Sequence, residues 1–301
     1  MKSTRNKTIV LGDEEKSKYL EKCITLSGFC DNMTDCTVKG DVFKVAKKLK
    51  KESIDLLVVD PPYNMSKNFG GYKFGKKSDD EYASFTRGWI EALLPALKKT
   101  ASIYVCCDWK SGMIIGNILA EYFTIRSRIS WQREKGRGAK DNWKNGMEDI
   151  WYCVLSDEFT FNLDKVKIRR KVLAPYKENG VAKDWFETDK GKFRDTCPSN
   201  FWDDVTVPYW SMSENTPHPT QKPEKLIAKL ILASSNEGDL VLDPFAGSGT
   251  TAVVAKKLNR KFIAIEQNKD YCALTQKRLE MANADTSIQG YNGVFMERNS
   301  K

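Results

Sequence analysis

The sequence constrains the fold most at the tetrapeptide Asp60-Pro61-Pro62-Tyr63, which directly follows an apolar run. The run Ile54–Val59 predicts a strand that is buried on both faces of a parallel sheet. Two consecutive prolines cannot donate to a sheet ladder, so the strand must end there. We therefore expect the Asp60 carboxylate, the Pro61 carbonyl and the Tyr63 ring at the carboxyl edge, where open α/β sheets bind ligands. Two acceptors beside an aromatic ring suit an exocyclic amino group on a flat heterocycle.

A second informative segment, Asp243-Pro244-Phe245-Ala246-Gly247-Ser248-Gly249-Thr250-Thr251, follows the predicted strand 239–242. Its glycines let the backbone approach a ligand closely, because they carry no Cβ. Its N–H groups and the helix start that follows favour a carboxylate or phosphate. Glu266 stands at the tip of the next predicted strand, where an acidic residue binds ribose hydroxyls in dinucleotide folds. The expected ligand therefore has an anionic group at one end and a ribose further along.

Two other interpretations of this glycine-rich turn can be weighed. A phosphate-binding P-loop requires Gly-Lys-Ser/Thr, and here Gly249 is followed by two threonines, so that interpretation fails. A nicotinamide-binding turn fits in its looser form, with Gly247, Gly249 and Ala252. The preceding Asp-Pro-Phe and the distant Asp60 tetrapeptide disfavour it, but it stays open, as does a plain glycine turn.

Together and in this order, the two segments resemble the signature of the β class of DNA amino-methyltransferases, over residues 40–279. The resemblance implies a Rossmann-like α/β fold: a mostly parallel twisted sheet, helices on both faces and circularly permuted motifs. It further implies S-adenosylmethionine as cofactor and methyl transfer to an amino group of a base flipped out of duplex DNA. Asp at the first tetrapeptide position favours adenine N6. The alternatives are cytosine N4 and a catalytically silent DNA-binding module of the same fold.

The resemblance also implies roles for individual residues. Asp41 is similar to the carboxylate that binds the adenine amino group of the cofactor, with a plain helix N-cap as the alternative. Thr220 and Lys222 match positions near the carboxylate end of the cofactor, with a turn-and-cap role as the alternative. His218, the only histidine, is expected to be a turn residue. The predicted catalytic set is Asp60, Pro61, Pro62 and Tyr63, and the predicted cofactor set is Asp41, Asp60, Thr220, Lys222, Asp243, Phe245, Ala246, Gly247, Ser248, Gly249, Thr250 and Glu266.

The composition changes between residues 133 and 198, which are richer in Lys, Arg, Asp and aromatic residues. We expect an inserted target-recognition region there, with short strands at 151–155 and 159–163. The predicted organisation is an N-terminal arm (1–38), a first catalytic part (39–132), the insert (133–198), a second catalytic part (199–285) and a frayed tail (286–301). The net charge of +9 supports a polyanionic partner. Predicted DNA contacts are Lys67, Lys73, Lys76, Lys77, Arg133, Arg137, Lys140, Arg169 and Arg170.

The chain of 301 residues has eight cysteines, but no two have the spacing of a zinc knuckle or redox pair, so no metal site is predicted. No apolar run approaches the roughly 18 residues of a membrane span, and no secretory signal is visible. The resemblance therefore implies a bacterial cytoplasmic enzyme whose partner is double-stranded DNA. It leaves open a homodimer and a separate cognate restriction endonuclease.

Overall fold

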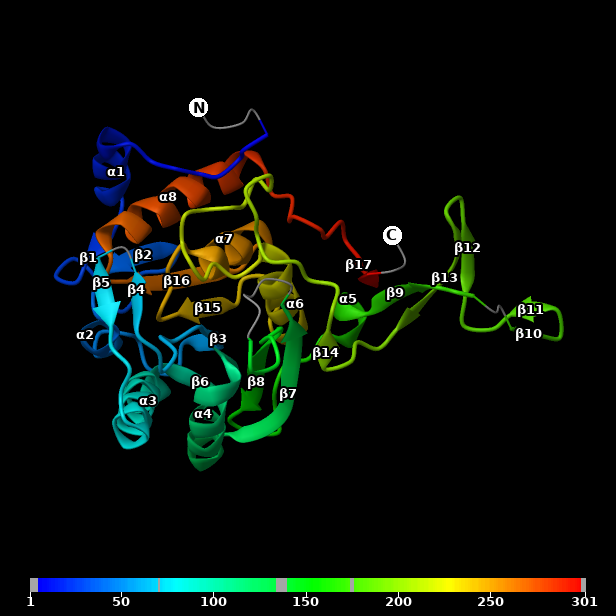
Figure 1. Cartoon of the computed structure of the whole chain (residues 1–301), viewed down its shortest axis with the longest axis horizontal. Helices are drawn as coiled ribbons and strands as arrows, with labels where there is room; N and C mark the ends of the chain where they lie inside the picture. The colour runs from blue at the N-terminus through cyan, green and yellow to red at the C-terminus, as the bar shows by residue number, and fades with distance from the viewer. Residues whose placement is uncertain (1–4, 70, 134–139, 174–175, 299–301) are drawn as a thin grey trace.

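The computed structural model describes residues 5–69, 71–133, 140–173 and 176–298 (Figure 1). A nine-stranded sheet forms its centre, in the order β1-β2-β16-β15-β3-β6-β8-β7-β14. Strand β8 runs antiparallel to its neighbours β6 and β7, and the other neighbouring pairs of this sheet are parallel. The bounds are β1 (Ile24–Thr25), β2 (Cys36–Lys39), β3 (Ile54–Val59), β6 (Leu97–Cys107), β7 (Thr124–Gln132), β8 (Met147–Val154), β14 (Phe201–Trp202), β15 (Leu240–Asp243) and β16 (Lys261–Glu266).

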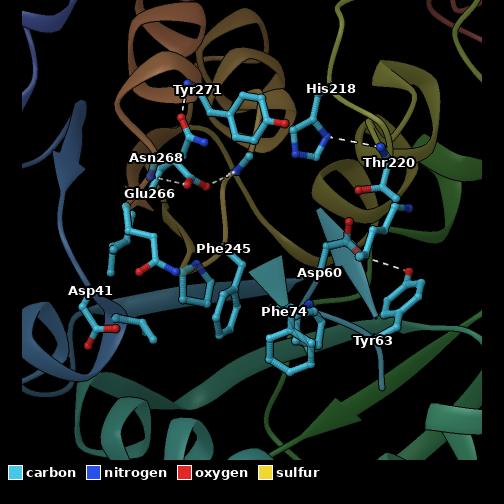
Figure 2. A pocket seen from close by; sticks show the side chains of 18 of the residues that line it. Asp41, Asp60, Tyr63, Phe74, His218, Thr220, Phe245, Glu266, Asn268 and Tyr271 are labelled. Atoms are coloured by element: carbon cyan, nitrogen blue, oxygen red, sulfur yellow. Dashed lines mark hydrogen bonds between the residues drawn. The ribbon is translucent and has the colours of Figure 1, made fainter. Parts of the chain in front are cut away.

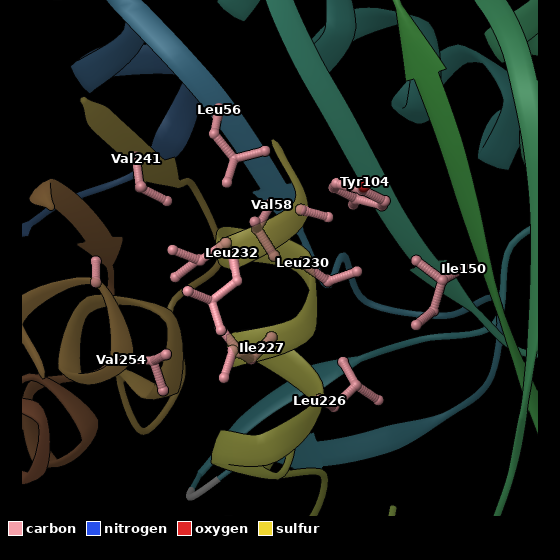
Figure 3. Packing of buried hydrophobic residues seen from close by; sticks show 14 of the residues in the cluster. Leu56, Val58, Tyr104, Ile150, Leu226, Ile227, Leu230, Leu232, Val241 and Val254 are labelled. Carbon is pink, nitrogen blue, oxygen red and sulfur yellow. The ribbon is translucent and has the colours of Figure 1, made fainter. Parts of the chain in front are cut away.

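Helices cover both faces of this sheet. Alternate residues of β3 point to opposite sides: Leu56 and Val58 pack with α6 (Glu224–Ser234) and α7 (Thr250–Lys257) in one cluster (Figure 3). Leu57 and Val59 pack in a second cluster, with α2 (Val42–Ala46), α3 (Asp79–Leu93) and α4 (Trp109–Tyr122). The burial of this strand on both faces and the predicted α/β fold class are therefore confirmed.

Local capping explains where the helices on the second face begin. Ser78 caps α3 by accepting from the backbone N–H of Glu81, and the Glu81 side chain accepts from the N–H of Ser78 in return. Asp108 caps α4 in the same sense, by accepting from the N–H of Ser111. Across the described ranges, no helix has the length and apolar character needed to cross a membrane.

A second, smaller part projects from the body of the molecule as an arm (Figure 1). Its four-stranded sheet has the order β12-β13-β9-β17, and a short pair, β10 and β11, lies beside it. A separate hairpin, β4 and β5, follows β3 closely in the chain. The bounds are β4 (Lys67–Phe69), β5 (Tyr72–Phe74), α5 (Leu163–Val166), β9 (Ile168–Lys171), β10 (Lys177–Glu178), β11 (Val181–Ala182), β12 (Phe186–Thr188), β13 (Gly191–Thr196) and β17 (Phe295–Met296).

The N-terminal boundary differs from the predicted one. Residues 1–38 were expected to form a separate N-terminal segment, distinct from the arm described above. Strand β2, however, begins at Cys36 and pairs with β16 in the main sheet. Helix α1 (Asp13–Leu20) packs on α8 (Lys269–Ala284), where the Tyr19 hydroxyl donates to Glu280. The polar, aperiodic sequence hides this docking because only a few of its residues, such as Tyr19, are buried.

The boundaries of the insert and of the tail also differ. Strand β8 was assigned to the insert, yet it lies inside the main sheet between β6 and β7. The expected strand 159–163 does not form, and α5 begins at Leu163. The tail is not frayed where it is described, because β17 pairs with β9 and Phe295 is fully buried. The differences at β8 and β17 arise from long-range pairings that local sequence does not encode.

Candidate active site

The two informative segments meet at one edge of the sheet. Strands β15 and β3 are parallel neighbours, in a register that places Val241 opposite Leu56. Their carboxyl ends therefore deliver Pro244 and Asp60 to the same place. A cavity of about 240 Å³ opens there and is lined by residues that follow both strands (Figure 2). The two strand tips therefore converge on one cavity in the structure.

The glycine turn forms one wall of this cavity. Gly247 and Gly249 both have left-handed backbones, with φ of 52° and 75°. A Cβ at Gly247 would lie 2.8 Å from Nε2 of His218, and one at Gly249 would collide with Thr275. Both positions consequently require glycine, for conformation and for space. The turn is packed from behind and from the side, so its backbone is fixed before any ligand arrives.

Two carboxylates flank the cavity at this end. Glu266 accepts the N–H of Gly247 at 2.8 Å and the N–H of Asn268 at 2.7 Å, and burial raises its pKa. Asp41 accepts the N–H of Phe43 at 3.0 Å as the N-cap of α2 and also lines the cavity. The expected N-cap role and a place beside the ligand are therefore compatible. A carboxylate has about four lone-pair sites, so both side chains can accept further hydrogen bonds from a ligand.

The other predicted cofactor residues fall into two groups. Asp60, Thr220, Phe245 and Gly247 line the cavity with Asp41 and Glu266. Ser248 and Thr250 lie behind the turn, where Arg278 donates to the Ser248 carbonyl and to the Thr250 hydroxyl. Asp243 is buried at the end of β15, accepts the N–H of Phe245, and has its pKa raised to about 7 by burial. These residues, with Ala246 and Gly249, are absent from the lining and shape the turn.

Sequence reasoning missed part of the wall. His218 was expected to be only a turn residue, but its ring lines the cavity and packs edge-on against Tyr271, with centroids 4.5 Å apart (Figure 2). Burial lowers the pKa of His218 to about 3, so the ring stays neutral near pH 7. The sequence carries no signal for this contact, which depends on the tight approach to Gly247. Further lining residues that were not predicted include Met65, Phe85, Gln267 and Asn268.

The opposite end of the cavity is an ionic cluster around Asp60. The Lys222 ammonium donates to Oδ2 of Asp60 at 2.6 Å, and the Tyr63 hydroxyl donates to Oδ1 at 2.9 Å. Burial alone would lower the pKa of Lys222, but Asp60 and Glu148 together raise it above its usual value. Lys222 is absent from the cavity lining, but its ammonium contacts Asp60, which lines the cavity. The expected place of Lys222 near the carboxylate end of the cofactor stays a prediction.

Glu148, at the start of β8, completes the cluster. It is 4% exposed and forms an ion pair with Arg133, which directly follows β7. Its Oε2 atom lies 3.4 Å from the Lys222 ammonium and 3.3 Å from the Tyr63 hydroxyl. Burial, followed by the charges of Asp60 and Glu148, raises the pKa of Tyr63, which therefore keeps its proton. Two carboxylates and two cations thus balance one another beside the tetrapeptide.

The predicted DNA contacts occupy two surfaces. Near the cavity, Lys67 lines its wall, Lys73 and Lys76 are exposed, and Lys77 lies over the Phe74 ring. Lys140 is also exposed, whereas Arg133 is paired with Glu148.

On the arm, the predicted contacts already have acidic partners. Arg169 makes a two-point contact with Asp195 at 2.8 Å, and Arg170 lies 3.6 Å from Glu297. Arg137 lies outside the described residues.

In those described residues, no group of three or more His, Cys, Asp or Glu side chains is arranged to hold a metal ion.

Comparison with known proteins decides the family. A protein family described as DNA methylase (N6_N4_Mtase) matches residues 54–277. The chain belongs to this family. It is 35% identical to the Type II methyltransferase M.HpaI of Haemophilus parainfluenzae, over 85% of this chain and 76% of that protein. It is 37% identical to the DNA adenine methyltransferase YhdJ of Escherichia coli, over 84% of this chain and 85% of that protein.

Solved structures agree on the fold. The M1.HpyAVI complex with S-adenosylmethionine has a TM-score of 0.56 at 24% identity, over 81% of this chain and 98% of that one. The cytosine-N4-specific PvuII DNA methyltransferase has a TM-score of 0.60 at 17% identity, over 88% of this chain and 95% of that one. The predicted family, fold and methyltransferase activity on DNA are confirmed, and the adenine prediction agrees with the name of YhdJ.

The cofactor predicted with the family, S-adenosylmethionine, fits the cavity. Glu266 can accept from ribose hydroxyls, and Asp41 can accept from an adenine amino group. Within the glycine turn, Gly247 lines the cavity, and its missing Cβ leaves room beside His218. The acceptors at this end therefore match the ribose and the adenine amino group of the cofactor.

Proposed function

We propose that this DNA methylase transfers the methyl group of S-adenosylmethionine to N6 of adenine at a specific site in duplex DNA. The observation that carries the proposal is the cavity that joins the Gly247 turn to Asp60. When bound, the cofactor supplies an electrophilic sulfonium methyl group. The Asp60 tetrapeptide at the other end of the same cavity offers the acceptors that an aromatic amino group requires.

The chain's own residues act by positioning and electrostatics. The nitrogen of an aromatic amino group is a poor nucleophile, because its lone pair is shared with the ring. The Asp60 carboxylate and the Pro61 carbonyl accept its two hydrogens, which localises the lone pair and aims it along the cavity. Tyr63 stacks on the base, and Pro62 fixes the backbone between these groups. A base in duplex DNA must be flipped out of the helix to reach them.

DNA is held by the two basic surfaces described above. The hairpin β4–β5 borders the cavity, because Lys67 lines the cavity wall. Lys73 and Lys76 are therefore placed to contact phosphates beside a flipped base. The arm, with Arg169 and Arg170, serves as the target-recognition region. Base-specific contacts from the arm determine the recognised sequence.

The proposal includes a place in bacterial restriction–modification. The name of M.HpaI as a Type II methyltransferase supports this setting. A cognate endonuclease that cuts the same unmethylated site and a second copy of this chain are the protein partners that it includes. The bacterial cytoplasm, which holds the DNA to be modified, is the proposed location.

The direct test is methyl transfer from labelled cofactor to mixed-sequence duplex DNA, followed by mass identification of the modified nucleoside. We expect N6-methyladenine from the unaltered protein. The Asp60→Ala variant should bind the cofactor with little change and transfer no methyl group, because one amino acceptor is gone. N4-methylcytosine as sole product would establish the cytosine alternative. DNA binding without any transfer would establish the silent module, and turnover by Asp60→Ala would overturn the role of Asp60.

A further inference from the structure

The Tyr63 hydroxyl stands between two carboxylates. It is 2.9 Å from Oδ1 of Asp60 and 3.3 Å from Oε2 of Glu148. A phenol has one proton to donate, so at any moment it serves one carboxylate well and the other poorly. Lys222 also donates to the Tyr63 oxygen at 3.1 Å, which fills an acceptor position of the phenol and directs its proton toward the carboxylates.

The two oxygens of Asp60 are consequently not equivalent. Oδ2 is held by the Lys222 ammonium at 2.6 Å, in a charge-assisted contact inside the protein. Oδ1 is the oxygen left for an incoming amino group, and Tyr63 donates to it in the structure. The substrate must therefore compete with the protein's own hydroxyl for the acceptor that methyl transfer requires.

Glu148 offers the hydroxyl a second place to donate. It is almost fully buried, is absent from the cavity lining, and is held from behind by Arg133. It also contacts the Lys222 ammonium, at 3.4 Å. Because Glu148 lies within β8, opposite Trp131 of β7, and Arg133 directly follows β7, the carboxylate is fixed by the main sheet. Glu148 cannot contact a base in the cavity, so any role in transfer acts through Tyr63 and Lys222.

We infer that Glu148 is a positioning residue for methyl transfer. It takes the Tyr63 hydroxyl when the target amino group arrives, so that Oδ1 of Asp60 is released to the substrate. The inference rests on the proposed role of Asp60. No covalent bond forms or breaks in this step, since the phenol hydrogen bond moves from one carboxylate to the other.

The test is a double-mutant cycle between Glu148 and Tyr63. Glu148→Gln keeps the shape of the side chain but makes it a weaker acceptor, so the hydroxyl stays on Asp60. We expect its single-turnover methyl transfer rate to fall by about 100-fold, as for a misplaced reacting group. Cofactor affinity and DNA affinity should be unchanged. Tyr63→Phe removes the competing hydroxyl, so adding Glu148→Gln to that variant should cause little further loss.

A structural role for Glu148 predicts a different pattern. If Glu148→Gln lowers the rate by the same factor with and without the Tyr63 hydroxyl, or does not lower it at all, the inference is overturned. Asp204→Asn is the matched control, because Asp204 is also buried and paired with two lysines, Lys225 and Lys229, away from the cavity. It should lower stability without lowering the single-turnover rate of folded protein.

A replacement variant and a comparison of two variants separate the possible outcomes. Should Glu148→Gln fail to fold, Glu148→Asp retains the charge and withdraws the carboxylate from Tyr63, and the same cycle with Tyr63→Phe applies. Failure of the inference is also distinct from failure of the proposed function. An inactive Asp60→Ala variant beside a fully active Glu148→Gln variant overturns only the inference, whereas an active Asp60→Ala variant overturns both.

Discussion

The two ends of the active-site cavity are built in different ways. At the cofactor end, the glycine turn is held largely by hydrogen bonds between backbone and side chains of neighbouring elements. One example is the bond that the Gly247 N–H donates to the Glu266 carboxylate. At the acceptor end, Asp60 is held by Lys222, 162 residues away, and Tyr63 is near Glu148, 85 residues away. One end is fixed by conformation and the other by charge. A change at the first should alter cofactor affinity, and a change at the second should alter transfer.

The largest expected effect follows from removing the Lys222 ammonium at the acceptor end. Lys222→Met leaves the buried Glu148 and the partly buried Asp60 without their shared partner, which should cost about 3–5 kcal/mol of the free energy of unfolding. Methyl transfer should fall steeply while the remaining folded protein still binds cofactor. Thermal unfolding and single-turnover transfer measure the two effects.

Lys225→Met is the control for this change. Lys225 lies on helix α6, is also buried, and is paired with Asp204. It should destabilise the protein comparably yet leave transfer by folded molecules intact. Equal losses of transfer in both variants would show that the acceptor end depends on general stability and not on its own charges.

A smaller effect is expected at the cofactor end. Gly247→Ala places a Cβ against His218 and forces a left-handed backbone on a residue that disfavours it by roughly 1–2 kcal/mol. The variant relieves this strain by moving the turn, and the cofactor must restore the turn on binding, so cofactor affinity should fall by roughly tenfold. Calorimetry of cofactor binding measures this.

Transfer at saturating cofactor should change much less in Gly247→Ala than in the Lys222 variant. Gly12→Ala, where the added Cβ meets no atom within 4 Å, is the neutral control. An unchanged cofactor affinity in Gly247→Ala would place the cofactor elsewhere.

The smallest effect extends the comparison to the DNA surface. Lys73 and Lys76 are exposed on and beside the hairpin, whereas Arg169 and Arg170 have acidic partners in or beside the arm. Replacing both lysines by Gln should weaken the salt dependence of DNA binding, because its slope falls by about 1 for each phosphate that the protein no longer neutralises.

The corresponding Arg169→Gln and Arg170→Gln changes should reduce the slope less, because those charges are already partly neutralised. DNA-binding titrations over a range of salt concentrations compare the two pairs. A larger change from the arginines would shift the main phosphate contacts to the arm.

Local sequence sufficed where a single segment contains its own structural reason. The apolar run before Asp60 predicted a doubly buried strand, and Pro61 and Pro62 predicted its end. The glycines of the second segment predicted a turn that only glycine can adopt, and Glu266 was placed at the right strand tip. Backbone conformation and burial pattern are local properties, so they could be read without a fold.

Long-range contacts were beyond that reasoning. Strand β8 was assigned to the insert, because nothing in its sequence tells which strands it pairs with. Phe295 was placed in a frayed tail although it is buried beside Lys229. The contact of the Lys222 ammonium with Asp60 was not predicted. Each outcome depends on which distant element supplies the partner, and a buried charge must be near an opposite charge wherever the fold provides one.

The sequence alone determined the chemistry offered at each strand tip: two amino acceptors beside an aromatic ring, and a glycine turn for an anionic ligand. The order of these segments was enough to indicate the family. Only the tertiary structure decided that Lys222 contacts the Asp60 carboxylate, that Glu148 and Arg133 complete this cluster, and that His218 closes the wall at Gly247. The physical reason is that strand order and helix packing set which charges share a buried site, and neither is encoded within a single segment.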